Sequence, residues 1–159
     1  MSAPFNLLEN AMVVSAAVPK DITGAAYAGD YVSMRDAEEL WILIQQGAWA
    51  GGTPAFTVGA GTTASGGTTA AVTAFEAWEG TALTDDQYAA VTVAAGTFNL
   101  RNTANTFTIV RVKAAALPDG KPFVRGEIAT PGANADLLSM VYILTGLKHQ
   151  GNVPPTVIA

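Results

Sequence analysis

Two apolar stretches near opposite ends of the chain decide the fold: LWILIQQG at Leu40–Gly47 and SMVYIL at Ser139–Leu144. Both are short and contain β-branched and aromatic residues, which favours strands over helices. The first stretch ends at a group of glycines, which give the backbone freedom to turn, and at Pro54, which has no N–H to donate to a neighbouring strand. We therefore expect Leu40–Gln46 to be a central strand of a sheet.

Working outward from these stretches, the sequence predicts further short strands separated by Gly, Pro and Asn turns. The clearest is Thr106–Lys113, where alternate residues form two distinct faces. Pro118-Asp119-Gly120 predicts a turn, because proline fixes φ and glycine accepts a positive φ. Thr62–Thr69 is expected to be a Gly/Ser/Thr loop. The remaining predicted strands are Tyr31–Met34, Ala55–Val58, Ala70–Trp78, Ala90–Ala94, Phe123–Ala129 and Leu137–Thr145.

This pattern predicts an all-β fold: an antiparallel β-sandwich, jelly-roll-like, of about eight strands. The sandwich domain is expected to span residues 28–146, with an N-terminal arm at 1–27 and an extended C-terminal tail at 147–159. Within the arm, Val13–Ala17 is either extended or an edge strand, and a helix over Phe5–Val14 competes with it. The tail is expected to lie on another subunit or to pack back on its own domain.

The composition and the charge of the chain argue against nucleic-acid binding and against a membrane span. The chain of 159 residues is 50% hydrophobic and only 13% charged, so much of its surface is small and uncharged. Either an alanine-rich bias or a surface for packing against neighbours accounts for this. The net charge is −5 and the basic residues are scattered, so we expect no nucleic-acid partner. No apolar run approaches the roughly 20 residues of a membrane span, and Met1–Asn10 lacks the basic start of a secretory signal.

No constellation of residues points to catalysis, a cofactor or a metal, and we expect none of these. Gly59–Ala64 matches the letters of a dinucleotide-binding loop, but a loop and another strand follow where the phosphate site needs a helix. His149 is the only histidine and has no carboxylate beside it. The pairs Glu38-Glu39 and Asp85-Asp86 fit solvated turn charges better than a cation site.

Three aromatic residues illustrate the alternatives. Trp41 and Tyr142 lie within apolar strands and are expected in the core. Trp49 lies in a loop of small residues, where a large aromatic side chain serves as an interface anchor or as a ligand contact.

Four segments resemble small virion proteins of tailed bacteriophages, in particular head decoration (cement) proteins. They are Gly29–Met34, Gln46–Thr53 at the end of the central strand, Val141–Leu144 and Pro154–Ile158, and the resemblance extends from about Val14 to the end. The lead-in Arg35–Trp41 is more acidic than in that family. The resemblance implies a β-sandwich that forms homotrimers, binds the major capsid protein on the outer surface of the head and clamps neighbouring capsomers. It implies no catalytic residue. The absence of a secretory signal predicts synthesis in the host cytoplasm, and the charge and the short apolar runs predict no nucleic-acid or membrane partner.

Two other functions stay open on the sequence. A tail-tube or head–tail joining subunit fits the same viral context, and a carbohydrate-binding module could use Trp49. For the decoration role, the residues expected at the interface are Trp49, Pro154, Pro155, Val157 and Ile158.

Overall fold

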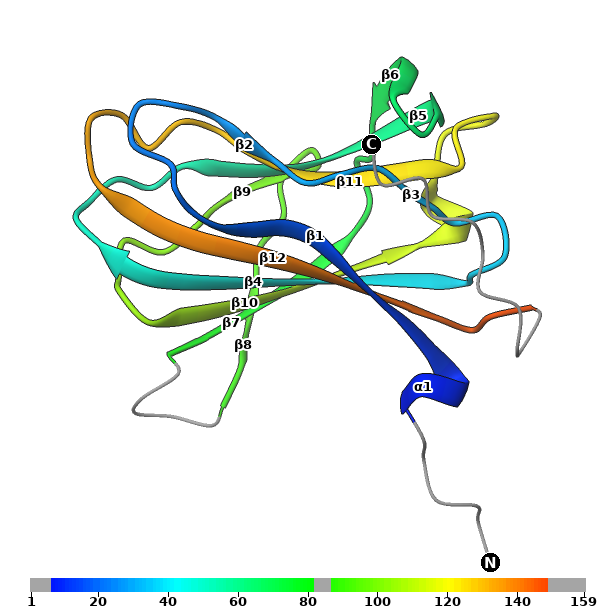
Figure 1. Ribbon diagram of the computed structural model, residues 1–159, viewed down its shortest axis with the longest axis horizontal. Coiled ribbons are helices and arrows are strands. Elements are labelled where there is room, and N and C mark those ends of the chain that lie inside the picture. Colours follow the sequence, from blue (N-terminus) through cyan, green and yellow to red (C-terminus); the bar gives the residue numbers. More distant parts are fainter. Residues whose placement is uncertain (1–6, 82–86, 149–159) are drawn as a thin grey trace, which may run out of the picture.

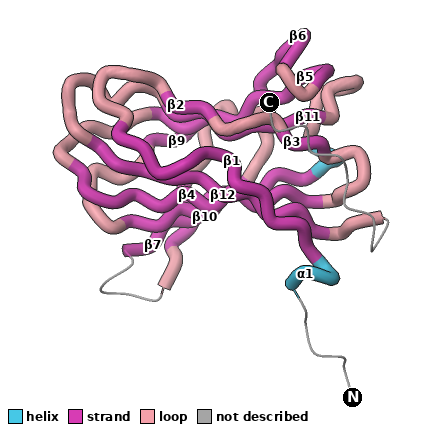
Figure 2. Tube along the Cα trace, viewed as in Figure 1, coloured by secondary structure: helices cyan, strands magenta, loops and turns pink. Residues whose placement is uncertain are grey.

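Two antiparallel sheets pack face to face in the computed structural model, which describes residues 7–81 and 87–148 (Figures 1 and 2). The first sheet has the order β1 (Ala11–Asp21), β12 (Asp136–Thr145), β4 (Glu39–Trp49), β10 (Thr106–Lys113), β7 (Glu76–Thr81) and β8 (Ala89–Val91). The second has the order β2 (Tyr27–Ala28), β11 (Phe123–Ile128), β5 (Ala55–Thr63) and β6 (Gly66–Ala71), with β3 (Val32–Ser33) on β11 and β9 (Thr97–Asn99) on β5. The described helices are a turn at Leu7–Asn10 (α1) and a 3₁₀ turn at Ala114–Ala116 (η1). The predicted all-β sandwich is confirmed.

The two decisive stretches lie side by side. β4 pairs with β12 so that Ile42 is opposite Tyr142 and Ile44 is opposite Met140. β4 lies between β12 and β10, which confirms it as a central strand. The inward residues of these strands form one core with the second sheet; they include Leu40, Ile42, Ile44, Met140, Tyr142 and Leu144, packed with Phe56, Val58, Val124 and Ile128.

Tyr142 joins the two sheets and is a core residue, as expected. The backbone N–H of Gly126 in β11 donates to its hydroxyl oxygen at 2.7 Å. Burial raises the pKa of the Tyr142 phenol well above its ordinary value. A side chain at position 126 would crowd this contact, because a Cβ there would lie 2.9 Å from the Met140 sulfur. The close approach of the sheets therefore requires glycine at this point.

The glycine-rich middle of the chain is more regular than the sequence predicts. β5 runs through Gly59 and Gly61 and turns into β6, so the loop expected at Thr62–Thr69 is instead a hairpin. Ala64 and Ser65 make the turn, and Gly66 and Gly67 follow it at the start of β6 with φ of +97° and +58°, which glycine adopts without strain. The hairpin projects from the sandwich at the upper end of the view in Figure 1.

Other strand boundaries also differ. The strand predicted at Ala70–Trp78 is split, since β6 ends at Ala71 and β7 begins at Glu76. The described residues form twelve strands where the sequence predicts about eight, because this segment is split, β1 lies in the predicted arm, and β2 and β9 are too short to leave a pattern. Two predictions hold closely: β10 has its predicted bounds, and Lys121 N–H donates to the Pro118 carbonyl at 3.1 Å across the predicted turn.

The segment before Tyr27 belongs to the sandwich. β1 pairs with β12 from Ala11 opposite Thr145 to Asp21 opposite Leu137, with two irregularities on the way. Val14, Ala16, Ile22 and Tyr27 are buried in the core. The N-terminal arm predicted at 1–27 is therefore not separate from the sandwich over residues 11–27, because their apolar side chains cover the edge of the core. The edge-strand interpretation of Val13–Ala17 is the correct one.

At the other end, the chain is tied to the domain as far as residue 148. Leu147 packs against the core, and Lys148 N–H donates to the Asp36 carbonyl at 2.9 Å. The rest of the predicted tail lies outside the described residues, and with it His149, Pro154, Pro155, Val157 and Ile158.

Glu79 carries a pH-dependent cost to stability. It lies in β7 opposite Thr108, whose side chain is fully buried between the sheets, and its Oε1 is buried without a hydrogen-bond partner. Burial raises the pKa of this carboxyl above its ordinary value of 4.5, although Arg101 pulls it the other way. Because the folded state holds the proton more tightly than the unfolded one, stability is highest below that value and falls as the pH rises through the folded-state pKa.

We predict that Glu79→Gln is more stable than the wild type at neutral pH and that the difference shrinks as the pH falls toward 4.5. Urea denaturation across this pH range measures it. Glu38→Gln removes the same charge at an exposed position and serves as the control. A gain that is equal at all pH values would show that ionisation of Glu79 is not the cause.

Candidate interaction surface

The outer face of the first sheet is apolar. An antiparallel sheet that covers a core on one face usually presents polar residues on the other. Here the outward residues of the central strands are Trp41 and Leu43 in β4, Val141 and Ile143 in β12, Phe107 and Ile109 in β10, and Trp78 in β7. All are half-buried, whereas the inward residues of the same strands are fully buried. The expectation that Trp41 lies in the core is therefore wrong, since it belongs to the opposite side of the sheet.

The strand registers arrange this face in three rows that cross β12, β4, β10 and β7. The charged row is Ile143, Trp41, Arg111 and Glu76; the apolar row is Val141, Leu43, Ile109 and Trp78; the polar row is Ser139, Gln45, Phe107 and Gly80. Tyr88 packs its ring edge-on to Phe107 in the polar row, at 6.4 Å between ring centres. Around the rows, Val13, Leu137 and Tyr88 are each more than two-fifths exposed.

Arg111 organises the charged row. Its guanidinium lies 5.4 Å from the ring centre of Trp41 and 5.7 Å from that of Trp78, and the two indoles stack with centres 6.2 Å apart. Its Nε donates to Glu76 at 2.7 Å, and its Nη1 lies 3.8 Å from Glu39. Exposed ion pairs of this kind add little stability. Their effect is to hold the cation flat against the aromatic rings and to neutralise that end of the face.

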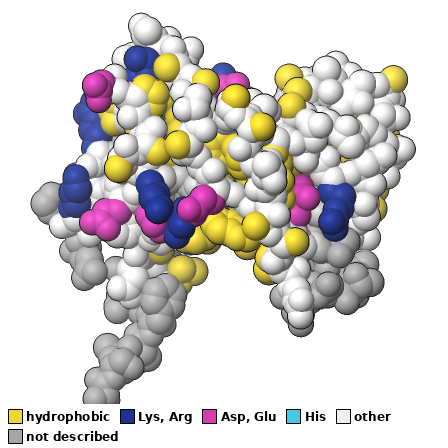
Figure 3. All heavy atoms as spheres, turned by 180° about the vertical axis from the view of Figure 1, so that it is seen from behind, with side chains coloured by type: hydrophobic (Ala, Val, Ile, Leu, Met, Phe, Trp, Pro, Cys, Tyr) yellow, Lys and Arg dark blue, Asp and Glu magenta, His cyan; other side chains and the backbone are white. Residues whose placement is uncertain are grey.

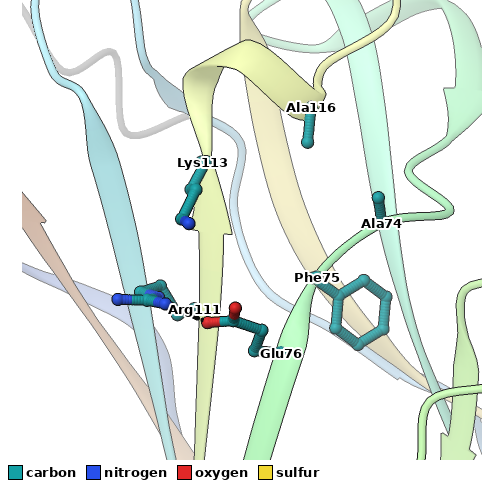
Figure 4. A pocket seen from close by; sticks show the side chains of 6 residues that line it. All are labelled: Ala74, Phe75, Glu76, Arg111, Lys113 and Ala116. Carbon is teal, nitrogen blue, oxygen red and sulfur yellow. Dashed lines mark hydrogen bonds and ion pairs between the residues drawn. The ribbon is translucent and has the colours of Figure 1, made fainter.

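A hollow of about 270 Å³ lies beside this row (Figure 4). It is lined by Ala74, Phe75, Glu76, Arg111, Lys113 and Ala116. The Phe75 ring meets Phe56 of the core edge-on at 6.2 Å between centres. The Glu76 carboxylate is already engaged by Arg111, and Lys113 is the third charged side chain in the lining. Seen from behind, apolar side chains gather at the centre of the molecule next to acidic and basic ones (Figure 3).

Trp49, which the sequence predicts as an interface anchor, is half-buried at the end of β4. It packs against the core, and its Nε1–H donates to the Gly52 carbonyl at 3.2 Å. The following loop is held by buried Asp136, whose Oδ1 accepts from Ala50 N–H at 2.7 Å and Gly51 N–H at 3.3 Å. The indole therefore has a structural role within its own loop, and its role as an anchor stays a prediction.

The structure also shows where the motifs considered for chemistry lie. Gly59–Ala64 belongs to β5 and its turn, so no helix follows it. Within the described residues, no three His, Cys, Asp or Glu side chains are grouped to hold a metal ion. No helix in the described ranges is long and apolar enough to cross a membrane. Asp85-Asp86 and His149 lie outside those ranges.

Sequence reasoning missed Arg111 and Trp78 as surface residues. The available signal was the unbroken apolar character of Leu40–Ile44 and Met140–Leu144, because a strand with one face on a core and one in water should alternate.

No known family model and no curated protein sequence matches this chain. Among solved structures, the chain is similar to SPBc2 prophage-derived protein YomS, with a TM-score of 0.48 and 10% sequence identity over 86% of this chain and 94% of that chain. At this level of similarity nothing about the family or activity follows.

Proposed function

We propose that this protein is a virion structural protein of a tailed phage that decorates the outside of the assembled head and acts by binding. The observation that carries the proposal is the uncharged, exposed edge strand β6, which we assign to the capsid below; the apolar outer face of the first sheet is a second contact surface. Strands that are apolar on both faces belong where a second layer covers them, and large uncovered apolar patches mark contact surfaces. The sequence resemblance to decoration proteins supplies the kind of partner, the major capsid protein.

The β5–β6 hairpin is the surface that we assign to the capsid. From Gly59 to Ala71 it carries no charged residue, and β6 forms the edge of the second sheet with most of its side chains exposed. An edge strand without charge or proline is open to pairing with a strand of another protein. Several such edges on one assembly would add their contacts by avidity.

Cryo-electron microscopy of the parent particle tests the location. We expect density for this chain on the outer shell of the head, and its confinement to the tail would contradict the proposal and favour the tail-tube alternative.

Co-sedimentation with heads that lack the protein tests the edge. We predict that Thr69→Glu on β6 weakens attachment at least about tenfold, because a charge at the pairing edge has to be desolvated. Thr103→Glu, which adds the same charge in an exposed turn, should bind like the wild type. Equal binding by both variants would remove the hairpin from the interface.

A further inference from the structure

The centre of the outer face is free of charge and large enough for a specific contact. The first sheet is six strands wide. At about 4.8 Å between strands and about 3.4 Å per residue along them, the sheet offers an area of roughly 24 by 20 Å, or about 500 Å². Two such faces together remove about 1,000 Å², which is the lower limit for a specific protein interface.

The rows of this face are complementary to themselves. A twofold axis that lies in the interface and crosses the strands over the apolar row would place each strand of one copy over the same strand of the other. Val141, Leu43, Ile109 and Trp78 would then meet their own copies, and the charged row would lie over the polar row.

This arrangement suits the charges. Arg111 of one copy would approach Phe107 and Tyr88 of the other, which present aromatic rings in the polar row. The two copies of Arg111 would lie about 14 Å apart along the strands, because four residues separate the charged and polar rows. Since Arg111 is paired with Glu76 and Glu39, no unpaired charge of the charged row is buried.

We propose that the outer face of the first sheet is the interface between two copies of this chain, related by that twofold axis. A second copy fits better than an unrelated partner, because an identical face has the same area, places its own apolar row on the apolar row, and places its polar row on the charged row. The family resemblance implies a trimer, whereas this face assembles a pair. The proposal does not depend on decoration of the head: a monomer that still binds heads would overturn the pairing and leave the proposed function standing.

The experiment measures the mass of the full chain by size-exclusion chromatography with light scattering over micromolar concentrations. The wild type is expected at twice its chain mass of 16.3 kDa. Ile109→Glu and Ile109→Lys each place like charges against their own copies at the axis, so each variant alone should be monomeric. A mixture of the two should regain the dimer, because the charges are then opposite.

The exposed Val18→Glu, at the edge of the sheet away from the three rows, should remain dimeric and is the matched control. Circular dichroism confirms folding; if either Ile109 variant fails to fold, the same pair of charges at Leu43 replaces it. A wild-type chain that is monomeric throughout overturns the proposal, as does a pair of monomeric variants whose mixture stays monomeric. If a wild-type monomer dimerises only after removal of residues 151–159, the tail rather than a second copy covers the face.

Discussion

Phe56→Ala is expected to lower the free energy of unfolding by about 3–5 kcal/mol, the cost of removing a large aromatic side chain from a packed core. Phe56 in β5 is 0% exposed. Its ring centre lies 5.3 Å from that of Phe98 in β9 and 6.2 Å from that of Phe75 in the connection between β6 and β7, so it links both segments to the core. Truncation would leave a cavity that these rings cannot fill without shifting. Urea denaturation at a low protein concentration measures the effect.

Phe107→Ala is the matched control, because Phe107 is half-buried on the outer face and, among the residues that the structure describes, Tyr88 is its one aromatic neighbour. We expect it to cost less than half as much. The low concentration matters, since association of copies through that face would add to the apparent stability. Equal losses for the two variants would mean that the outer face is as tightly packed as the core. That result would contradict the assignment of one face of the first sheet to the core and the other to a contact surface.

The fold could be predicted from a few patterns with strong physical causes. Thr106–Lys113 has its observed bounds because strict alternation leaves one choice of face, and Pro118-Asp119-Gly120 turns because each residue has a conformational reason to do so. The central place of Leu40–Gln46 followed from its apolar character alone.

The errors have equally specific causes. Glycines in β5 suggested a loop, yet Gly61 is required there, since a side chain would collide with the Gly66 backbone in the hairpin. Strand preference depends on such neighbours more than on the residue itself. β1 was partly hidden for a related reason: Pro19 lies within it and Gly24 follows it closely, so the segment resembles an arm, while its pairing partner lies more than a hundred residues away in β12.

The candidate surface could not be predicted from the sequence. An unbroken apolar strand indicates that both of its faces are covered, but the sequence does not say which layer is the protein's own core. Trp41 illustrates this, because its place in an apolar run suggested the core and the register with Arg111 puts it outside. The sequence instead favours Trp49 as the contact residue, because small residues surround it, but the loop that follows it is held by Asp136.

Deletion of Gly151–Ala159 is expected to weaken attachment to heads at least about tenfold and to leave the melting temperature nearly unchanged. This prediction rests on the sequence, since the segment lies outside the described residues. It carries no charge, and Pro154-Pro155 favours extended backbone suited to lying along another protein. The described domain is complete without it: Leu147 already packs on the core, and Lys148 bonds to the carbonyls of Asp36 and Arg35.

Replacing the segment with glycine and serine of equal length is the control that separates its side chains from its length. If the apolar side chains clamp the capsid, this variant should detach as readily as the deletion, because a Gly/Ser chain reaches as far but offers nothing to bury. Head binding is measured by co-sedimentation and stability by thermal melting. A large drop in melting temperature on deletion would place the segment in the core of its own domain and would contradict the clamp, whereas unchanged binding with unchanged stability would leave the β5–β6 edge as the proposed contact with the head.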